Sequence, residues 1–230
     1  MRKLIANFFK NNLSKYWKKI DKNNFEKELI SMSDNFINSE SYNYISNYWQ
    51  YLCIDNYEKL REFGINNYGS TIAKNYNTYT KIEDKLIQQT MDEIGDDYYS
   101  SNTKLFKKHL GFSYKESIHY NYICLLLFHI LKKNSHFKYL DKLEDLTFLG
   151  FNDPYMQIEN YNITSDKIVS LLEIEKINRS FDINKCKTIL EIGAGSGRTA
   201  DAILSIYPST KYVICDIPPA LFISYKRLKL

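Results

Sequence analysis

The chain has 230 residues, of which 44% are hydrophobic and 25% are charged, and its formal net charge is +4. This is an ordinary soluble composition, with room for one large or two small domains. The longest apolar run, residues 122–131, is about half of the roughly 20 residues that a membrane helix needs. Lys and Arg form no basic stripe, so we expect neither a membrane span nor a nucleic-acid partner.

The cysteines and histidines form no ligand pattern. Cys53, Cys124, Cys186 and Cys215 are far apart without a C-x-x-C pair, and the amino-terminal apolar patch is too short for a signal peptide. Free cysteines suit a reducing compartment, so a cytoplasmic location is predicted. His109, His119, His129 and His136 lack the spacing of metal ligands, and no metal site is predicted.

The first 150 residues are predicted to be helical, because no proline precedes Pro154 and no glycine precedes Gly64. Apolar residues recur at helical spacing over residues 4–20, 23–36 and 42–60. We expect Asn23 or Asn24 to cap the second of these helices. Trp49, Leu52 and Cys53 are expected to face inward in the third.

Residues 63–79 interrupt this pattern with two glycines and many Asn, Ser and Thr residues, which indicate a loop. Asn75, Tyr76 and Tyr79 are candidates for a sugar-binding pocket there, and a solvated connector is the alternative. Further helices are predicted over residues 82–94 and 103–110, and a long one follows Ser113 as its cap.

Residues 148–161 contain Gly150 and Pro154 and are predicted to join two domains. Thr164 or Ser165 is then expected to cap a helix with a broad apolar face, which leads into the first strand.

The segment 187–219 carries the clearest motif. A β-prone run ends at Gly193, and Gly195 and Gly197 follow at alternate positions. A helical pattern then extends to Pro208, and a second strand ends at Asp216. Strand, glycine turn, helix, strand and acid form the pattern of the nucleotide-binding half of a doubly wound sheet.

The residue types explain what such a segment can bind. Glycine tolerates positive φ and lets a ligand lie against the backbone and the positive helix N-terminus. An acid at the end of the second strand, here Asp216, can accept two hydrogen bonds from a ribose diol.

Two features separate the possible cofactors. A dinucleotide fingerprint requires glycine at position 198, which is Arg198. Glu191, two residues before Gly193, would repel a pyrophosphate but suits a ligand with an ammonium and a sulfonium. The E-x-G-x-G-x-G pattern resembles the first motif of the class I S-adenosylmethionine-dependent methyltransferases. A nicotinamide or flavin site and a glycine turn without a ligand are the alternatives.

A closer resemblance is carried by LEIGAGSGRT and CDIPPALFISYKRL, with GFNDPYMQIENYNITSDKIVSLLEIEKINRSF before them. These segments resemble the bacterial sugar O-methyltransferases of surface-polysaccharide gene clusters, over roughly the last 80 residues. The resemblance implies a sugar or glycan acceptor and S-adenosylmethionine as cofactor. The residues that it implies for cofactor binding are Glu191, Gly193, Gly195, Gly197 and Asp216.

The resulting expectation is an α/β protein in which an all-helical region precedes the first β-α-β part of a Rossmann-like class I methyltransferase sheet. The predicted parts are a helical domain at 1–150, a joint and helix at 151–185, and a partial S-adenosylmethionine-binding domain at 186–230. A complete sheet of this class has seven strands and two are predicted here, so we expect an incomplete sheet, a fragment with little activity alone, and self-association or a complementing C-terminal fragment.

The sequence alone leaves the catalytic residues unknown. His109, His119 and His136 are possible general bases, although a residue beyond position 230 is favoured for that role. Arg198 is a candidate for contacting a phosphate or carboxylate of the acceptor. The rival hypotheses are a methyltransferase for RNA, protein or a small metabolite, and a helical interaction module with a vestigial cofactor site.

Overall fold

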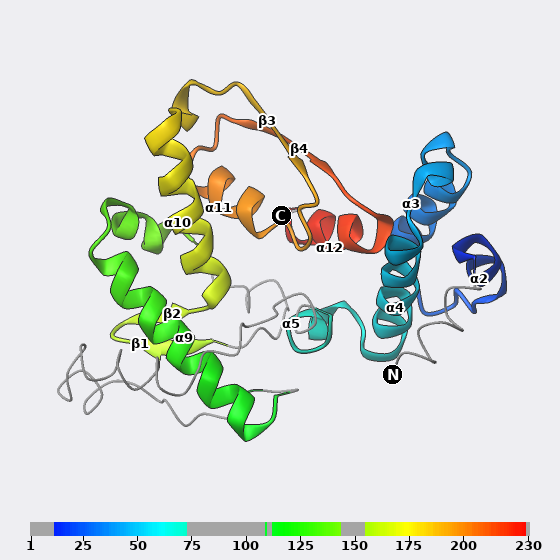
Figure 1. Ribbon diagram of the computed structural model, residues 1–230, viewed down its shortest axis with the longest axis horizontal. Helices are drawn as coiled ribbons and strands as arrows, with labels where there is room; N and C mark the ends of the chain where they lie inside the picture. The colour runs from blue at the N-terminus through cyan, green and yellow to red at the C-terminus, as the bar shows by residue number, and fades with distance from the viewer. Residues whose placement is uncertain (1–11, 73–108, 110–111, 144–154, 229–230) are drawn as a thin grey trace. The chain divides into compact units, whose positions relative to one another are not determined.

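The computed structural model describes residues 12–72, 109, 112–143 and 155–228 (Figure 1). The chain divides into two compact units. The first unit comprises residues 1–65, 190–197 and 213–230, and the second comprises residues 66–189 and 198–212. The predicted domain ranges 1–150, 151–185 and 186–230 stay a prediction.

The first unit is built mainly from helices. They are α2 (Leu13–Lys19), α3 (Lys27–Ile37), the 3-10 helix η1 (Glu40–Tyr44), α4 (Asn47–Phe63) and α12 (Pro218–Leu228). Helix α12 packs against α3 and α4 (Figure 1). Asn12 and Ser46 accept hydrogen bonds from the first turns of α2 and α4, and Gly64 ends α4 with φ of 70°.

Two of the expectations for these helices are wrong. Helix α3 is capped at Glu26, without a side-chain hydrogen bond, rather than at Asn23 or Asn24. Trp49 lies in the first turn of α4 with 43% of its surface exposed, although Cys53, one turn further on, is buried as predicted. Helical periodicity identifies the apolar face of a helix, but it does not show which turns of that face pack against other elements. The sequence therefore placed Trp49 in the core, although the first turn of α4 is exposed.

Aromatic rings fill the core of the first unit. The ring centroids of Trp17 and Tyr57 are 4.7 Å apart, and those of Phe25 and Tyr57 are 5.9 Å apart. The Tyr57 hydroxyl donates to Ser33 Oγ at 2.7 Å, and Ser33 Oγ donates to the Leu29 carbonyl. Each buried hydroxyl therefore has a partner, as buried polar groups require.

The second unit contains helices and a small antiparallel hairpin. Its main helices are α9 (Tyr114–Lys132), α10 (Ser165–Ser180) and α11 (Arg198–Ile206), and its short ones are α5 (Tyr68–Thr71), η3 (Ser135–Lys142) and η5 (Ile183–Lys185). Ser113 and Glu116 form a capping box at the start of α9, and Thr164 caps α10, so both predicted caps are confirmed.

A hairpin occupies part of the predicted joint. Strands β1 (Met156–Ile158) and β2 (Tyr161–Ile163) pair antiparallel, with Met156 opposite Ile163. The predicted loop over residues 63–79 is also partly helical, because η2 (Ile65–Asn67) and α5 lie within it. Residues 73–79 of that loop lie outside the described residues, as do the helix predicted over 82–94 and all of the helix predicted over 103–110 except His109.

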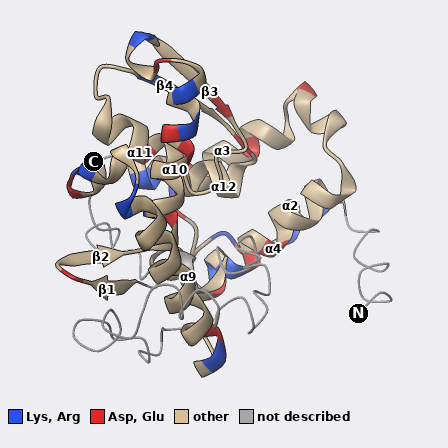
Figure 2. Ribbon diagram, turned by 60° about the vertical axis from the view of Figure 1, so that its left-hand side comes forward, with Lys and Arg blue, Asp and Glu red and all other residues tan. Residues whose placement is uncertain are grey.

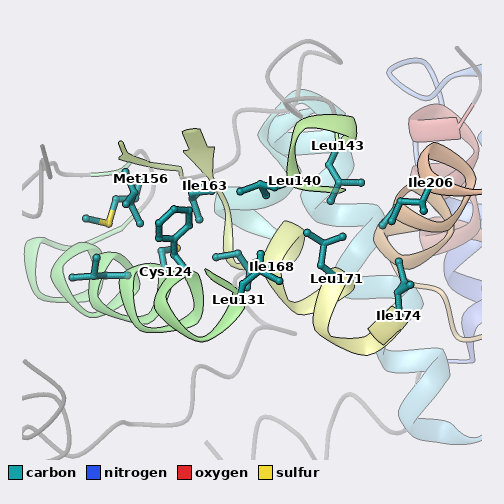
Figure 3. Close-up of a cluster of buried hydrophobic side chains, with 14 of the residues drawn as sticks. Cys124, Leu131, Leu140, Leu143, Met156, Ile163, Ile168, Leu171, Ile174 and Ile206 are labelled. Atoms are coloured by element: carbon teal, nitrogen blue, oxygen red, sulfur yellow. The ribbon is translucent and has the colours of Figure 1, made fainter. Parts of the chain in front are cut away.

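The core of the second unit lies where α10 packs against α9, α11 and η3. Figure 3 shows side chains from these helices and from the hairpin meeting there. The labelled members are Cys124, Leu131, Leu140, Leu143, Met156, Ile163, Ile168, Leu171, Ile174 and Ile206.

Strands β3 (Thr188–Ile192) and β4 (Lys211–Cys215) form a second two-stranded sheet. The Lys211 N–H donates to the Lys187 carbonyl at one end, and the Gly193 N–H donates to the Cys215 carbonyl at the other. The strands therefore run parallel, and β3, α11 and β4 form the predicted β-α-β unit. A mixed fold of helices with a small sheet is consistent with the α/β class expected from the sequence.

None of the helices in the described ranges is long and apolar enough to cross a membrane. Charged residues of both signs are distributed over the helices and strands that the structure describes (Figure 2).

Candidate cofactor-binding site

The candidate site is built on the glycine bend, residues 193–197, which connects β3 to α11. Gly193, Gly195 and Gly197 have φ of 79°, 61° and 73°. All three are in the left-handed region, where an L-residue with a Cβ is strained. The alternation of glycines is thus required by the backbone path of this bend.

One side of the bend is open and another is covered. A Cβ added at Gly193 or Gly195 would meet no atom of the described chain within 4 Å. A Cβ added at Gly197 would lie 3.1 Å from the Cβ of Ser224 in α12. A ligand can therefore approach the backbone at Gly193 and Gly195, while α12 occupies the space beside Gly197.

Asp216, the residue after β4, is held directly beside the bend. Its Oδ2 accepts a hydrogen bond from the Gly195 N–H at 2.7 Å, and its Oδ1 accepts one from the Ile217 N–H at 2.7 Å. A carboxylate oxygen can accept two hydrogen bonds. Counting the partners within the described chain, each oxygen keeps capacity for one more, which matches the two hydroxyls of a ribose diol.

The environment of Asp216 shifts its ionisation. Partial burial raises the pKa of the carboxyl above its usual value, and the hydrogen bonds from Gly195 and Ile217 partly offset this. Cys53 of α4 is buried near this carboxylate, and burial together with the charge of Asp216 raises the pKa of its thiol. The thiol is therefore neutral at physiological pH.

Helix α12 contacts the covered side of the bend through two residues one turn apart. Ser224 Oγ donates to the Gly195 carbonyl at 2.9 Å. Arg227 Nη1 donates to Ser196 Oγ at 2.9 Å and to the Ser196 carbonyl at 3.4 Å. Both side chains are buried. Sequence reasoning missed them, because Ser and Arg at this spacing in a helix match no cofactor motif.

Glu191 lies in β3, two residues before Gly193, and is half-buried. Together with the glycine bend and Asp216 it belongs to the first unit. All five residues predicted to bind the cofactor are thus in one compact unit, and their role in binding stays a prediction.

Arg198 is engaged differently from the expectation. In the second unit its Nη1 and Nη2 donate to the two carboxylate oxygens of Glu173 at 3.0 and 2.9 Å, and Nη1 also donates to Ser170 Oγ at 3.0 Å. A guanidinium already paired in this bidentate way is a poor receptor for an acidic group of an acceptor.

Two of the candidate general bases, His109 and His136, lie beside amide side chains. His109 is buried, with Nε2 2.6 Å from Asn121 Oδ1, and its backbone N–H donates to Ser117 Oγ. His136 Nε2 lies 3.3 Å from Asn178 Nδ2, and partial burial lowers the pKa of its imidazole. Asn75, Tyr76 and Tyr79, the candidates for a sugar-binding pocket, lie outside the described residues.

Comparison with known families adds a further observation. Residues 152–229 match the family model of the O-methyltransferase domain, and this segment includes the whole glycine bend and Asp216. The match supports an S-adenosylmethionine-dependent methyltransferase. Comparisons with curated proteins and with solved structures gave no match.

Proposed function

We propose that this chain is an S-adenosylmethionine-dependent O-methyltransferase whose donor is bound by Glu191, the glycine bend and Asp216. The observation that carries the proposal is the open backbone at Gly193 and Gly195 beside a carboxylate with two remaining acceptor positions. When bound, S-adenosylmethionine supplies a methyl group on a positively charged sulfur. Glu191 and Asp216 provide negative charge around such a ligand, and the bare bend allows close approach.

Methyl transfer depends mainly on the relative position of donor and acceptor. A hydroxyl of the acceptor must be aligned with the methyl group, and holding the two in place can supply most of the acceleration. A general base must take the hydroxyl proton.

Calorimetric titration with S-adenosylmethionine tests the donor site. Asp216→Asn removes the charge and exchanges one acceptor oxygen for a donor group, so we expect at least tenfold weaker binding. Asp141→Asn, at an exposed aspartate of η3, is the matched control. Failure of the unaltered protein to bind the donor would refute the proposal.

A sugar hydroxyl is our proposed acceptor, in the biosynthesis of a surface polysaccharide. Besides the sequence resemblance, it is supported by an aromatic surface in the first unit. Residues 41–54 contain no charged side chain, in a chain that is 25% charged. Tyr44, Tyr48 and Trp49 in this stretch are exposed, and Tyr44 exposes 87% of its surface. Neutral aromatic and amide groups suit a polyol better than they suit the phosphates of RNA.

The two tryptophans of the chain make the acceptor testable, because Trp17 is buried and Trp49 is exposed. In a Trp17→Phe variant the fluorescence of Trp49 alone reports on this surface. Nucleotide-linked sugars and glycans are expected to change that emission, whereas RNA is not. If RNA is methylated with labelled donor and sugars are not, the acceptor assignment is wrong.

We also propose that additional polypeptide covers one face of the β3–β4 sheet, either a second copy of the chain or a complementing fragment. Leu190 and Ile192 of β3 expose 61% and 79% of their surfaces, and Val213 of β4 is also exposed. Parallel strands are normally covered on both faces. Sedimentation analysis at rising protein concentration distinguishes self-association from a need for a second fragment.

The alternative of a vestigial cofactor site has one observation in its favour. The Gly195 N–H, which a ligand could use, already donates to Asp216. A purely structural bend would have this hydrogen bond as well. Calorimetric titration with S-adenosylmethionine distinguishes a functional site from a vestigial one. A vestigial site binds no donor, either in the unaltered chain or in Asp216→Asn.

A further inference from the structure

We infer that Ser224 and Arg227 of α12 are positioning residues for the methyl donor, acting through the glycine bend and not through contact with the ligand. This inference rests on the proposed donor site. It concerns the side of the bend that α12 covers, beside Gly197.

Ser224 fixes the middle of the bend. Its hydroxyl donates to the Gly195 carbonyl at 2.9 Å, while the Gly195 N–H donates to Asp216 at 2.7 Å. The two peptide groups that flank the Gly195 Cα are therefore both held by the chain segment that follows β4. Glycine has the widest conformational freedom of any residue, so a bend with three glycines needs such restraints to keep one shape.

Ser224 also limits the position of Gly197. The Cα, Cβ and Oγ of Ser224 are all within 3.3 Å of the place where a Cβ of residue 197 would be. Helix α12 can approach this closely only because residue 197 is glycine. The contact is tight and leaves the bend no room to move toward the helix.

Arg227 holds the intervening peptide. It lies one turn after Ser224, and its guanidinium donates to the side chain and the carbonyl of Ser196. Only 6% of the Arg227 surface is exposed. A buried guanidinium is costly unless its donors are used, so this arrangement is specific and is not a solvent-facing contact that could form in many ways.

The same segment therefore sets two parts of the donor site together. Asp216 accepts from the Ile217 N–H, and α12 begins at Pro218. Asp216, Ser224 and Arg227 thus belong to one short continuous segment, residues 216–227, that contacts residues 195–197. A shift of α12 would change the bend and the carboxylate at once.

The test compares Ser224→Ala with the unaltered chain by two measurements. Ser224→Ala leaves the Gly195 carbonyl without this donor, and we expect the dissociation constant for S-adenosylmethionine to rise about tenfold. Hydrogen exchange of the amides in residues 193–197 of the ligand-free protein is expected to accelerate. Ser31→Ala, at an exposed serine of α3 in the same unit, should change neither quantity.

A double-mutant cycle tests Arg227. Ser196→Ala removes the side-chain acceptor, and Arg227→Lys keeps the charge but loses the fork geometry. If Arg227 acts through Ser196, the two substitutions affect donor affinity less than additively. Denaturation curves without ligand identify any variant that merely fails to fold, and Ser224→Ala serves where Arg227→Lys does not fold.

The outcomes are distinguishable. An unaltered chain that binds the donor while Ser224→Ala binds equally well, with unchanged exchange of the bend amides, overturns this inference and leaves the proposed function standing. An unaltered chain that binds no donor overturns both.

Discussion

The carboxylate of Asp216 accepts a hydrogen bond from the backbone N–H of Gly195, 21 positions earlier in the chain, at 2.7 Å. This bond joins the end of β4 to the middle of the glycine bend. It brings together two features that the sequence separates by a helix and a strand.

The first prediction concerns pH. Burial raises the pKa of Asp216, and its ionised form is the one that can accept two ribose hydroxyls. Donor affinity should therefore increase as the pH rises, with a midpoint above the usual aspartate value of about 3.9. Calorimetric titrations at several pH values between about 4 and 7 would show this, and a pH-independent affinity would contradict it.

Stability should follow the opposite trend at the same group. Because the folded-state pKa is raised, the contribution of Asp216 to the free energy of unfolding is fully present below the unfolded-state pKa. It is lost as the pH rises through the folded-state pKa. The difference between the unaltered chain and Asp216→Asn, measured by urea denaturation at each pH, isolates this contribution.

The second prediction compares three glycines with positive φ. Gly195→Ala should cost about 1–2 kcal/mol from backbone strain alone, because an added Cβ meets nothing in the described chain. Gly197→Ala should cost more, since its Cβ would also press against Ser224. Thermal or urea denaturation of the two variants shows which substitution lowers the free energy of unfolding more.

The control for this series is Gly64→Ala. Gly64 has φ of 70°, similar open space and a place in the same unit, but it ends α4 and is not part of the bend. Gly64→Ala should therefore lose comparable stability and retain donor affinity, whereas Gly195→Ala should lose both. Equal donor affinity in the two variants would argue against a ligand on the open side.

The third prediction compares the stability effects of replacing a buried and an exposed leucine. Leu171 is fully buried in the core of the second unit, and Leu190 is mostly exposed. Leu171→Ala should lower the free energy of unfolding by about 3 kcal/mol through lost burial and a residual cavity. Leu190→Ala should change it by less than about 0.5 kcal/mol. A large loss at Leu190 would mean that the sheet face is already covered in solution.

The fourth prediction concerns the pair Arg198 and Glu173. Its two parallel hydrogen bonds are partly exposed, so we expect a coupling free energy of about 0.5–1 kcal/mol in a double-mutant cycle with Arg198→Gln and Glu173→Gln. The single hydrogen bond of Arg179 to Glu175, with a largely exposed arginine, is the control and should give a smaller value.

Much of the glycine-rich segment could be predicted from the sequence. The strands, the glycine turn and α11 between them were all expected, because alternating glycines, a helical stripe and a terminal acid leave few other structures for that stretch. The capping box of Ser113 and Glu116 was recognisable in part for the same reason, since capping depends on neighbouring residues.

Features that depend on distant contacts were not predictable. The hairpin of β1 and β2 appeared as a joint between domains, because three-residue strands give too short a pattern. The pairing of Arg198 with Glu173 joins two helices and has no sequence signal. Ser224 and Arg227 were unremarkable until the fold placed α12 against the bend.

The uncovered face at Leu190, Ile192 and Val213 has a practical consequence for anyone purifying this protein. Dyes that become fluorescent on apolar surfaces should stain the native chain, which would imitate a partly unfolded sample. Salting-out agents and high storage concentrations should promote reversible clouding, and a charged replacement at Ile192 should relieve it.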